Sequence, residues 1–319
     1  MLIVAVMNLR AFFNVRHKAR KHRFPFSGKK FLLFFFFPLI PFSFLFGNVY
    51  QKQNSDSLRI VKWLKEAKNT KLAVALAELD SAERLAREFN FQTLLARVYI
   101  QRGDVEMKND RLMAADSSYR LAHAILVNRA KDTDYLFLLK KLAICSYYLG
   151  NNQSVLNYTL AGLEESQKLH NRPLEGTFNN ITGIAMAGMG NNADALTYYQ
   201  RALDIFTSLK DEEKIASVEM NLGVLNEQQK DLEKAEQYYR KALLSAEKIN
   251  DTSLMSAAYN NLANIYSAHH DYRKALEYSF KSLALSRLMN DRYTEALDLN
   301  NIGDAYQKLK EYDKAFDYY

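Results

Sequence analysis

The chain contains a single cysteine, Cys145, among 319 residues. One thiol excludes an internal disulfide and any metal site built from several thiolates. Cys145 lies between apolar neighbours in "KKLAICSYYLG", so we interpret it as a small buried hydrophobe and not as a reactive thiol. The sequence also lacks a glycine-rich phosphate loop, a paired-histidine ligand motif and a nucleophile elbow. It therefore predicts no enzyme and no cofactor in residues 55–319.

Acidic residues are missing from the N-terminus, since no Asp or Glu occurs before Asp56. The preceding residues hold nine of the 43 Lys and Arg, which leaves 34 basic against 36 acidic residues in the rest of the chain. The formal net charge of +7 therefore describes the N-terminus alone. It does not indicate nucleic-acid binding by residues 55–319.

Proline is scarce, and three of the four prolines lie before residue 51 together with 12 of the 19 Phe. There a basic stretch, "RHKARKHRFPFSGKK", leads into apolar "FLLFFFFPLIPFSFLFG" and then into polar "NVYQKQNSDS". This order is typical of a secretory signal, here about residues 31–47. The alternative is an uncleaved membrane anchor over residues 31–50, although a spanning helix needs ~20 apolar residues. Both interpretations predict a protein that is exported, periplasmic or anchored to the membrane, with residues 1–54 as signal or anchor segment plus linker.

The remainder, residues 55–319, repeats with a 40-residue period. Apolar residues return at intervals of three and four, which is the helical period, and no stretch keeps the alternation of a strand. The sequence predicts an all-α fold of antiparallel helix pairs, about six and a half repeats with the last one cut at Tyr319. The period is clearest in small residues, which form two registers: Ala75, Ala115, Val155, Ala195, Ala235, Ala275 and Ala315, and then Ala82, Ala122, Gly162, Ala202, Ala242 and Ser282.

Each repeat is predicted to hold two helices that pack closely. In the unit that begins at Asp251, we expect a first helix to about His269 and a second helix from Asp271 to about Met289. Small residues two turns apart let the helices approach, and a larger residue such as Tyr239 fills the gap between them. One extra residue is expected in the fourth repeat. The predicted N-caps are Asn151, Asn191, Asp231, Asp271 and a weak Glu311 before second helices, and Asn171, Asp211, Asp251 and Asp291 before first helices.

These features resemble the tetratricopeptide repeat over residues 55–319. The best matches are "NLGVLNEQQKDLEKAEQYYRKAL", "NNLANIYSAHHDYRKALEY" and "NNIGDAYQKLKEYDKAFDYY". The unit is longer than the usual repeat of this family, which has about 34 residues. It is similar to the longer repeats of kinesin light chain and of bacterial peptide-sensing regulators. The resemblance implies a right-handed superhelical solenoid in which the first helix of each pair lines a concave groove.

Asparagines recur on the predicted first helices, at Asn180, Asn221, Asn261 and Asn301. Asn is a mediocre helix former, so this recurrence requires a reason. One reason is hydrogen bonding between neighbouring repeats, and the other is a ladder of amides that pairs with the backbone of an extended peptide. The sequence leaves both open. The remaining residues predicted to line the groove are Asn260, Asn264, Asn300, Lys140 and Tyr147.

The sequence thus predicts a non-enzymatic module that binds a peptide or protein in its groove. Two alternatives stay open. The chain could be the sensory half of a larger signalling protein, since bacterial proteins are known in which repeats of this kind precede a histidine kinase or a DNA-binding domain. It could also be a scaffold that self-associates through its open C-terminal repeat.

Overall fold

The computed structural model describes residues 55–129 and 132–319. Within these ranges the chain is helical apart from short turns, and no strand occurs. None of the helices there is both long and apolar enough to cross a bilayer. The predicted signal or anchor, residues 31–50, lies outside the described residues.

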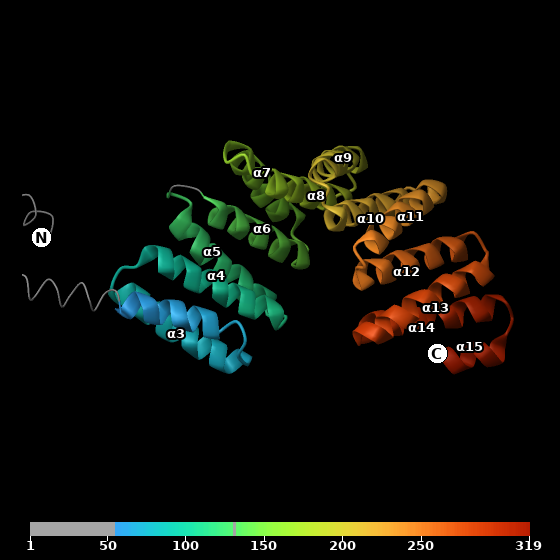
Figure 1. Cartoon of the computed structure of the whole chain (residues 1–319), viewed down its shortest axis with the longest axis horizontal. Coiled ribbons are helices and arrows are strands. Elements are labelled where there is room, and N and C mark those ends of the chain that lie inside the picture. The colour runs from blue at the N-terminus through green and yellow to red at the C-terminus, as the bar shows by residue number, and fades with distance from the viewer. Residues whose placement is uncertain (1–54, 130–131) are drawn as a thin grey trace, which may run out of the picture. The chain divides into compact units, whose positions relative to one another are not determined.

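The helices form consecutive antiparallel hairpins, each packed against the next (Figure 1). The first hairpin consists of a helix over residues 55–66 and α3 (Leu72–Glu88). In the hairpin that follows Asp251, both helices begin and end within one or two residues of the predicted positions. The other hairpins are α4 (Gln92–Lys108) with α5 (Leu112–Leu126), α6 (Thr133–Tyr148) with α7 (Asn152–Lys168), α8 (Arg172–Gly188) with α9 (Asn192–Leu209), α10 (Glu212–Gln228) with α11 (Leu232–Lys248), α12 (Thr252–Ala268) with α13 (Tyr272–Met289), and α14 (Arg292–Lys308) with the short α15 (Tyr312–Tyr318).

The connections between helices repeat more strictly than the sequence suggests. Among the described residues, each connection except those before α3 and before α6 contains one residue with positive φ, and from residue 150 to residue 310 these residues follow at equal intervals along the chain. The prediction of an extra residue in the fourth repeat is therefore wrong, because α8, α10, α12 and α14 also begin at equal intervals. The positive-φ residues are Asn90, Asp110, Gly150, His170, Gly190, Lys210, Lys230, Asn250, His270, Asn290 and Lys310.

Most of the predicted caps are confirmed. Asp251, for example, accepts hydrogen bonds from the backbone N–H groups of Ser253 and Leu254, both at 3.0 Å. Side-chain caps of this kind also occur at Asn151, Asn171, Asp211, Asp231, Asp271 and Asp291. Asn191 does not cap α9, because its amide turns toward the Met186 sulfur at 3.9 Å instead. Glu311, the weak cap, forms no cap bond and pairs with Lys314.

The hairpin cores contain the small residues as predicted, and all members of both registers are buried. Tyr239 fills the gap between Ala235 and Ala242, and it is fully buried. Its ring lies against Gly223 of the facing helix, where a Cβ would come within 2.4 Å of the ring. Cys145 is buried too, and burial raises the pKa of its thiol to about 11, so its interpretation as a buried hydrophobe is confirmed.

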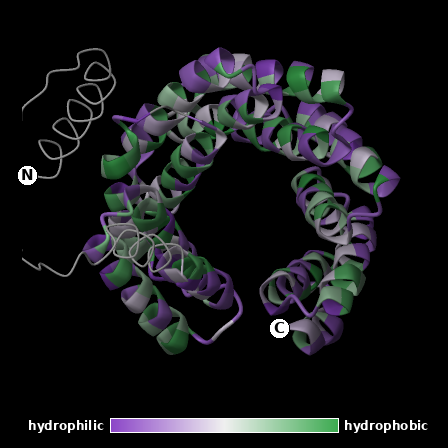
Figure 2. Ribbon diagram, turned by 60° about the vertical axis from the view of Figure 1, so that its left-hand side comes forward, coloured by the Kyte–Doolittle hydropathy of each residue, from purple (hydrophilic) through white to green (hydrophobic). Residues whose placement is uncertain are grey.

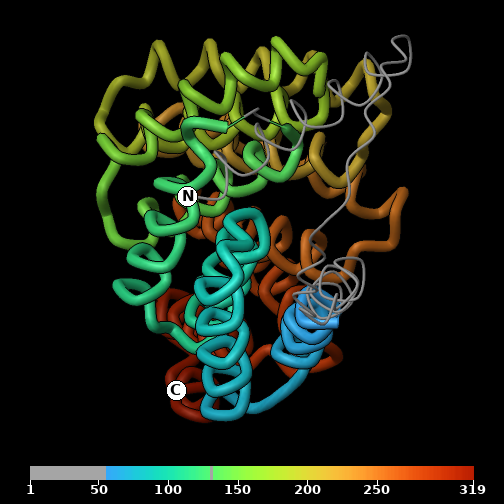
Figure 3. The backbone as a smooth tube through the Cα atoms, turned by 90° about the vertical axis from the view of Figure 1, so that its left-hand side faces the viewer, coloured from blue at the N-terminus to red at the C-terminus, as the bar shows by residue number. Residues whose placement is uncertain are grey.

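The first helices of successive hairpins lie closer together than the second helices. From α6 to α14 each first helix contacts the next one directly, whereas no comparable contact joins successive second helices in the described chain. Figures 2 and 3 show the hairpins of residues 55–319 following one another along an arc. Since elements on the inside of an arc approach most closely, the first helices form its concave side. We name this surface, built from residues 55–66, α4, α6, α8, α10, α12 and α14, the first-helix face.

Candidate functional site

Side chains at equivalent positions form rows across the first-helix face, because the first helices from α8 onward begin at equal intervals along the chain. This alignment corrects the predicted asparagine ladder. Asn180 belongs one position earlier in its helix than Asn221, Asn261 and Asn301 do. One row contains Ile100, Lys140, Asn180, Met220, Asn260 and Asn300, and the adjacent row contains Gln101, Lys141, Ile181, Asn221, Asn261 and Asn301.

The two rows are joined by hydrogen bonds between repeats. The amide of Asn221 donates to Asn180 Oδ1 at 2.9 Å, which links α10 to α8. Asn261 makes the equivalent contact one repeat later and links α12 to α10, with its Nδ2 3.1 Å from the sulfur of Met220. These side chains are half-buried. The geometry therefore shows hydrogen bonding between neighbouring repeats, which is one of the two explanations for why asparagine recurs on the first helices.

The last two first helices continue this pattern with different partners. Asn301 donates to Asn264 Oδ1 at 3.3 Å, and Asn264 in turn lies 3.5 Å from Asn260 Oδ1. Asn260 donates to Asp298 at 2.9 Å. Asp298 is fully buried, and burial raises the pKa of its carboxyl group, although hydrogen bonds from Asn260 and serine hydroxyls oppose this effect. Contact of these amides with a ligand stays a prediction.

Three other predicted groove residues are less constrained. Asn300 is exposed and reaches only Asp304 on its own helix, at 3.4 Å. Tyr147 is exposed near the end of α6 and makes an edge contact with Tyr148. Lys140 is half-buried with its Nζ 5.2 Å from the centre of the Phe137 ring. Burial, together with Lys141 and Lys214, lowers the pKa of the Lys140 amine.

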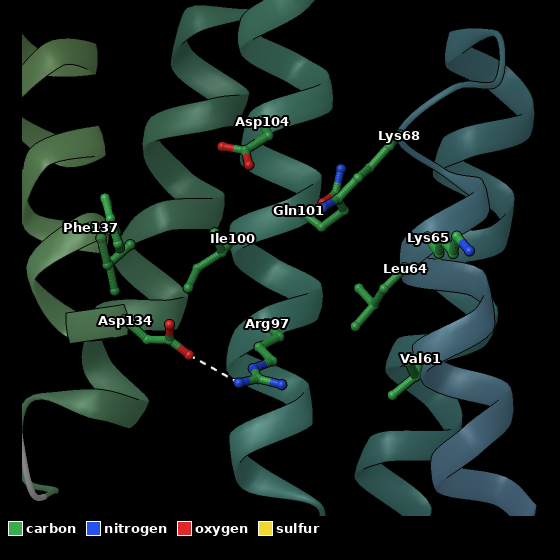
Figure 4. Close-up of a pocket in the computed structure, with 11 residues that line it drawn as sticks. Val61, Leu64, Lys65, Lys68, Arg97, Ile100, Gln101, Asp104, Asp134 and Phe137 are labelled. Carbon is green, nitrogen blue, oxygen red and sulfur yellow. Dashed lines mark hydrogen bonds and ion pairs between the residues drawn. The ribbon is translucent and has the colours of Figure 1, made fainter. Parts of the chain in front are cut away.

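A hollow of about 410 Å³ opens on the first-helix face at its N-terminal end (Figure 4). We name it hollow 1. Three successive first helices build it: the helix of residues 55–66 with the turn after it, α4 and α6. Its apolar lining consists of Val61, Leu64, Ile100, Phe137 and Leu138, and its polar lining of Lys65, Lys68, Arg97, Gln101, Asp104 and Asp134.

Charges around hollow 1 are arranged in pairs between repeats. Arg97 of α4 and Asp134 of α6 form an ion pair of 3.0 Å, drawn as the dashed line in Figure 4. Lys141 of α6 reaches back to Asp104 of α4 at 2.6 Å. Asp104 also accepts a hydrogen bond from the buried Tyr119 at 2.7 Å. These pairs link α4 to α6 along the hollow.

Sequence reasoning missed hollow 1 because it placed the groove on the asparagines of the later repeats. The row that contains Asn180 and Asn260 begins with Ile100, and the row one turn earlier begins with Arg97 and Phe137. Aligning those positions at the 40-residue period would have shown an apolar group at the N-terminal end. The sequence signal was the phenylalanine at position 137 of that row, and the structure leaves it 43% exposed, which is unusual for a phenylalanine.

The described part of the chain offers no site for metal chemistry, since no group of three or more His, Cys, Asp or Glu there is placed to hold an ion. The first-helix face instead offers a hollow with apolar walls, charged side chains and, further along, a row of amides. Such a surface is equipped for binding.

The comparison with protein families agrees with this architecture. Residues 175–248 and 253–319 match a family model described as tetratricopeptide repeat. These residues are tetratricopeptide repeats. No curated protein matches the chain closely enough to count as a relative.

Solved structures share the fold of this chain. BtubC (BKLC) from P. vanneervenii is 22% identical with a TM-score of 0.56, over 72% of this chain and 92% of that one. Aspartyl phosphate phosphatase F from Bacillus subtilis is 16% identical with a TM-score of 0.60, over 81% and 77%. The Rap conjugation gene regulator of the plasmid pLS20, in complex with the Phr* peptide, is 14% identical with a TM-score of 0.60, over 83% and 94%. At these identities the likeness concerns the fold alone.

Proposed function

We propose that this tetratricopeptide repeat protein binds an extended peptide segment on its first-helix face, with an apolar side chain of the peptide in hollow 1. The observation that carries the proposal is the hollow of about 410 Å³ formed by three successive first helices. Its size lies within the range of ~300–1,000 Å³ that ligand pockets occupy. The plasmid regulator of similar fold was solved with a peptide, which supports the same class of ligand here.

The lining of hollow 1 suits such a ligand. Phe137 and Val61 are partly exposed, so an apolar side chain that covers them removes apolar surface from water and gains about 25 cal/mol per Å². The peptide backbone needs polar partners at the same time, and the exposed Arg97 and Asp134 lie beside these apolar groups. The asparagines of α10 and α12 would contact a longer peptide further along the face.

A peptide array tests the proposal. Immobilised random dodecapeptides are probed with the full chain and with the variant Phe137→Asp, which places a charge in hollow 1. We expect a subset of peptides rich in apolar residues to bind the wild type and to lose at least roughly tenfold in signal with the variant, because a desolvated charge is costly. The matched control is Met113→Asp on α5, where the methionine is 71% exposed. Equal binding by both variants would refute the proposal.

We also propose that the repeats act outside the cytoplasm. This part rests on the sequence of residues 31–50, with a basic stretch before them and polar residues after them. Expression of the tagged full chain in bacteria followed by fractionation tests it. Recovery in the periplasm or membrane is expected, and soluble cytoplasmic protein that keeps its N-terminus would contradict it. A role for the repeats as the sensory half of a signalling protein stays a prediction.

A further inference from the structure

A second hollow lies beside hollow 1, also on the N-terminal repeats. It measures about 350 Å³, and we name it hollow 2. Ala96 at the start of α4, Leu126 at the end of α5 and Tyr135 at the start of α6 provide its apolar surface. Thr93, Arg129 and Asp132 form its polar side. Hollow 2 is therefore built at the N-terminal ends of α4 and α6, whereas hollow 1 extends further along the same two helices.

The two hollows share three residues, Arg97, Ile100 and Asp134. Ile100 contributes an apolar side chain to both. Arg97 and Asp134 face each other from α4 and α6, as Figure 4 shows, with Arg97 Nη2 3.0 Å from Asp134 Oδ2. The boundary between the hollows thus consists of Ile100 and one ion pair that bridges two repeats.

This ion pair is exposed, with 54% of the Arg97 side chain and 56% of the Asp134 side chain accessible to solvent. Exposed pairs contribute little to stability, because water solvates the separated charges nearly as well. The buried contacts between α4, α5 and α6 do not depend on it. The pair can therefore open or exchange partners without disturbing the fold.

The charges of the pair match the two hydrogen-bonding groups of a peptide unit. A guanidinium donates to a carbonyl oxygen, and a carboxylate accepts from a backbone N–H. A peptide that crosses the boundary meets both charges between two apolar hollows. Side chains on one side of an extended chain alternate with those on the other, so two of them can point toward the protein with a peptide unit between them.

We propose that the ligand carries two apolar side chains, one for each hollow, and that its backbone crosses the Arg97–Asp134 pair and hydrogen-bonds to it. This inference rests on the proposed function and narrows it to a class of ligand, an extended peptide with two apolar anchors. Arg97 and Asp134 then determine specificity. They select for peptides in which a backbone N–H and a backbone carbonyl between the two anchors are available for hydrogen bonds.

Short synthetic peptides test this directly on the full chain. The probes are acetyl-Leu-(Gly)-Leu-amide peptides with one, two or three glycines, and one-leucine peptides of the same lengths in which the second leucine is glycine. Dissociation constants come from saturation-transfer NMR titrations. At one spacing we expect the two-leucine peptide to bind roughly tenfold more tightly or better, because the second anchor binds as part of the same molecule.

Variants that fill one hollow assign the anchors. Val61→Phe fills hollow 1 and Thr93→Phe fills hollow 2, and both side chains are exposed, so the fold should persist. Each variant should reduce the two-leucine affinity to that of a one-leucine peptide. Thr93→Val is the matched control, because it removes the hydroxyl that accepts from Arg129 without filling the hollow. Arg97→Ala should weaken the two-leucine peptide several-fold at an unchanged melting temperature.

The outcomes separate this inference from the proposed function. If one-leucine peptides bind and Val61→Phe abolishes their binding, but no two-leucine peptide binds better, the two-anchor inference is wrong and the proposed function stands. Insensitivity of the two-leucine peptide to Thr93→Phe would overturn the inference in the same way. Absence of saturation transfer to every peptide would overturn both.

Discussion

Within each hairpin, the distance between the two helices depends on single side chains that face each other. Tyr239 packs on Gly223, and the same pairing of tyrosine with glycine recurs in three other hairpins, at Gly103 with Tyr119, Gly183 with Tyr199 and Gly303 with Tyr319. Where the first helix has Ala263, the equivalent position on the second helix is Ser279. A tyrosine on the second helix is thus paired with a glycine on the first helix, and the alanine is paired with a smaller residue, because a Cβ opposite the tyrosine ring would force the backbones apart.

The substitution Gly223→Ala tests this size matching. The new Cβ would lie 2.4 Å from Cε1 of the buried Tyr239, so we expect a loss of about 1–3 kcal/mol in the free energy of unfolding, measured with urea. The control is Gly188→Ala near the end of α8, where the nearest atom is the flexible amide of Asn152. It should change stability little.

A double-mutant cycle extends the same test. Gly223→Ala combined with Tyr239→Ser recreates the alanine and serine of the α12–α13 hairpin. The double variant should lose less stability than the sum of the two single losses, because the clash disappears with the ring. Strict additivity would mean that the two side chains do not limit the approach of α10 and α11.

The helices themselves, one level above the side chains, were largely predictable from the sequence. Caps such as Asp251 and the evenly spaced turns are local features, so they can be read from neighbouring residues. The cap predicted at Asn191 was wrong. The amide of Asn191 lies against the Met186 sulfur instead, and only the folded turn brings that partner close. The register of Asn180 failed because identical residues were aligned instead of helix starts.

Bonding between first helices leads to a prediction for the asparagines. Asn221→Ala removes the hydrogen bond to Asn180 and leaves a half-buried acceptor without its partner, so we expect a loss of about 0.5–1.5 kcal/mol in stability. Asn300→Ala is the control, since that side chain is exposed and contacts only Asp304 on its own helix. Thermal unfolding followed by circular dichroism measures both.

The outcome also separates the two explanations for these residues. A lower melting temperature for Asn221→Ala with unchanged peptide binding would assign the amide to the stack. An unchanged melting temperature together with lost peptide binding would contradict that assignment and place the amide in the ligand site.

Across the whole repeat region, the first-helix face changes character along its length. Its N-terminal end has hollows lined by apolar side chains such as Phe137 and by exposed charges such as Arg97. Its C-terminal end has amides that hydrogen-bond to one another. The fold and the identity of the first helices followed from the regular period of the sequence. Hollow 1 did not, because its walls come from three repeats and depend on residues in which those repeats differ.

Hydrogen exchange of the full chain, followed by mass spectrometry, tests the central claim most directly. The amides are compared with and without the tightest peptide from the array. Binding on the first-helix face predicts slower exchange in residues 55–66, α4 and α6, with little change in the second helices α5 and α7. Protection confined to the second helices would contradict the account, since the ligand would then occupy the opposite side of the repeats.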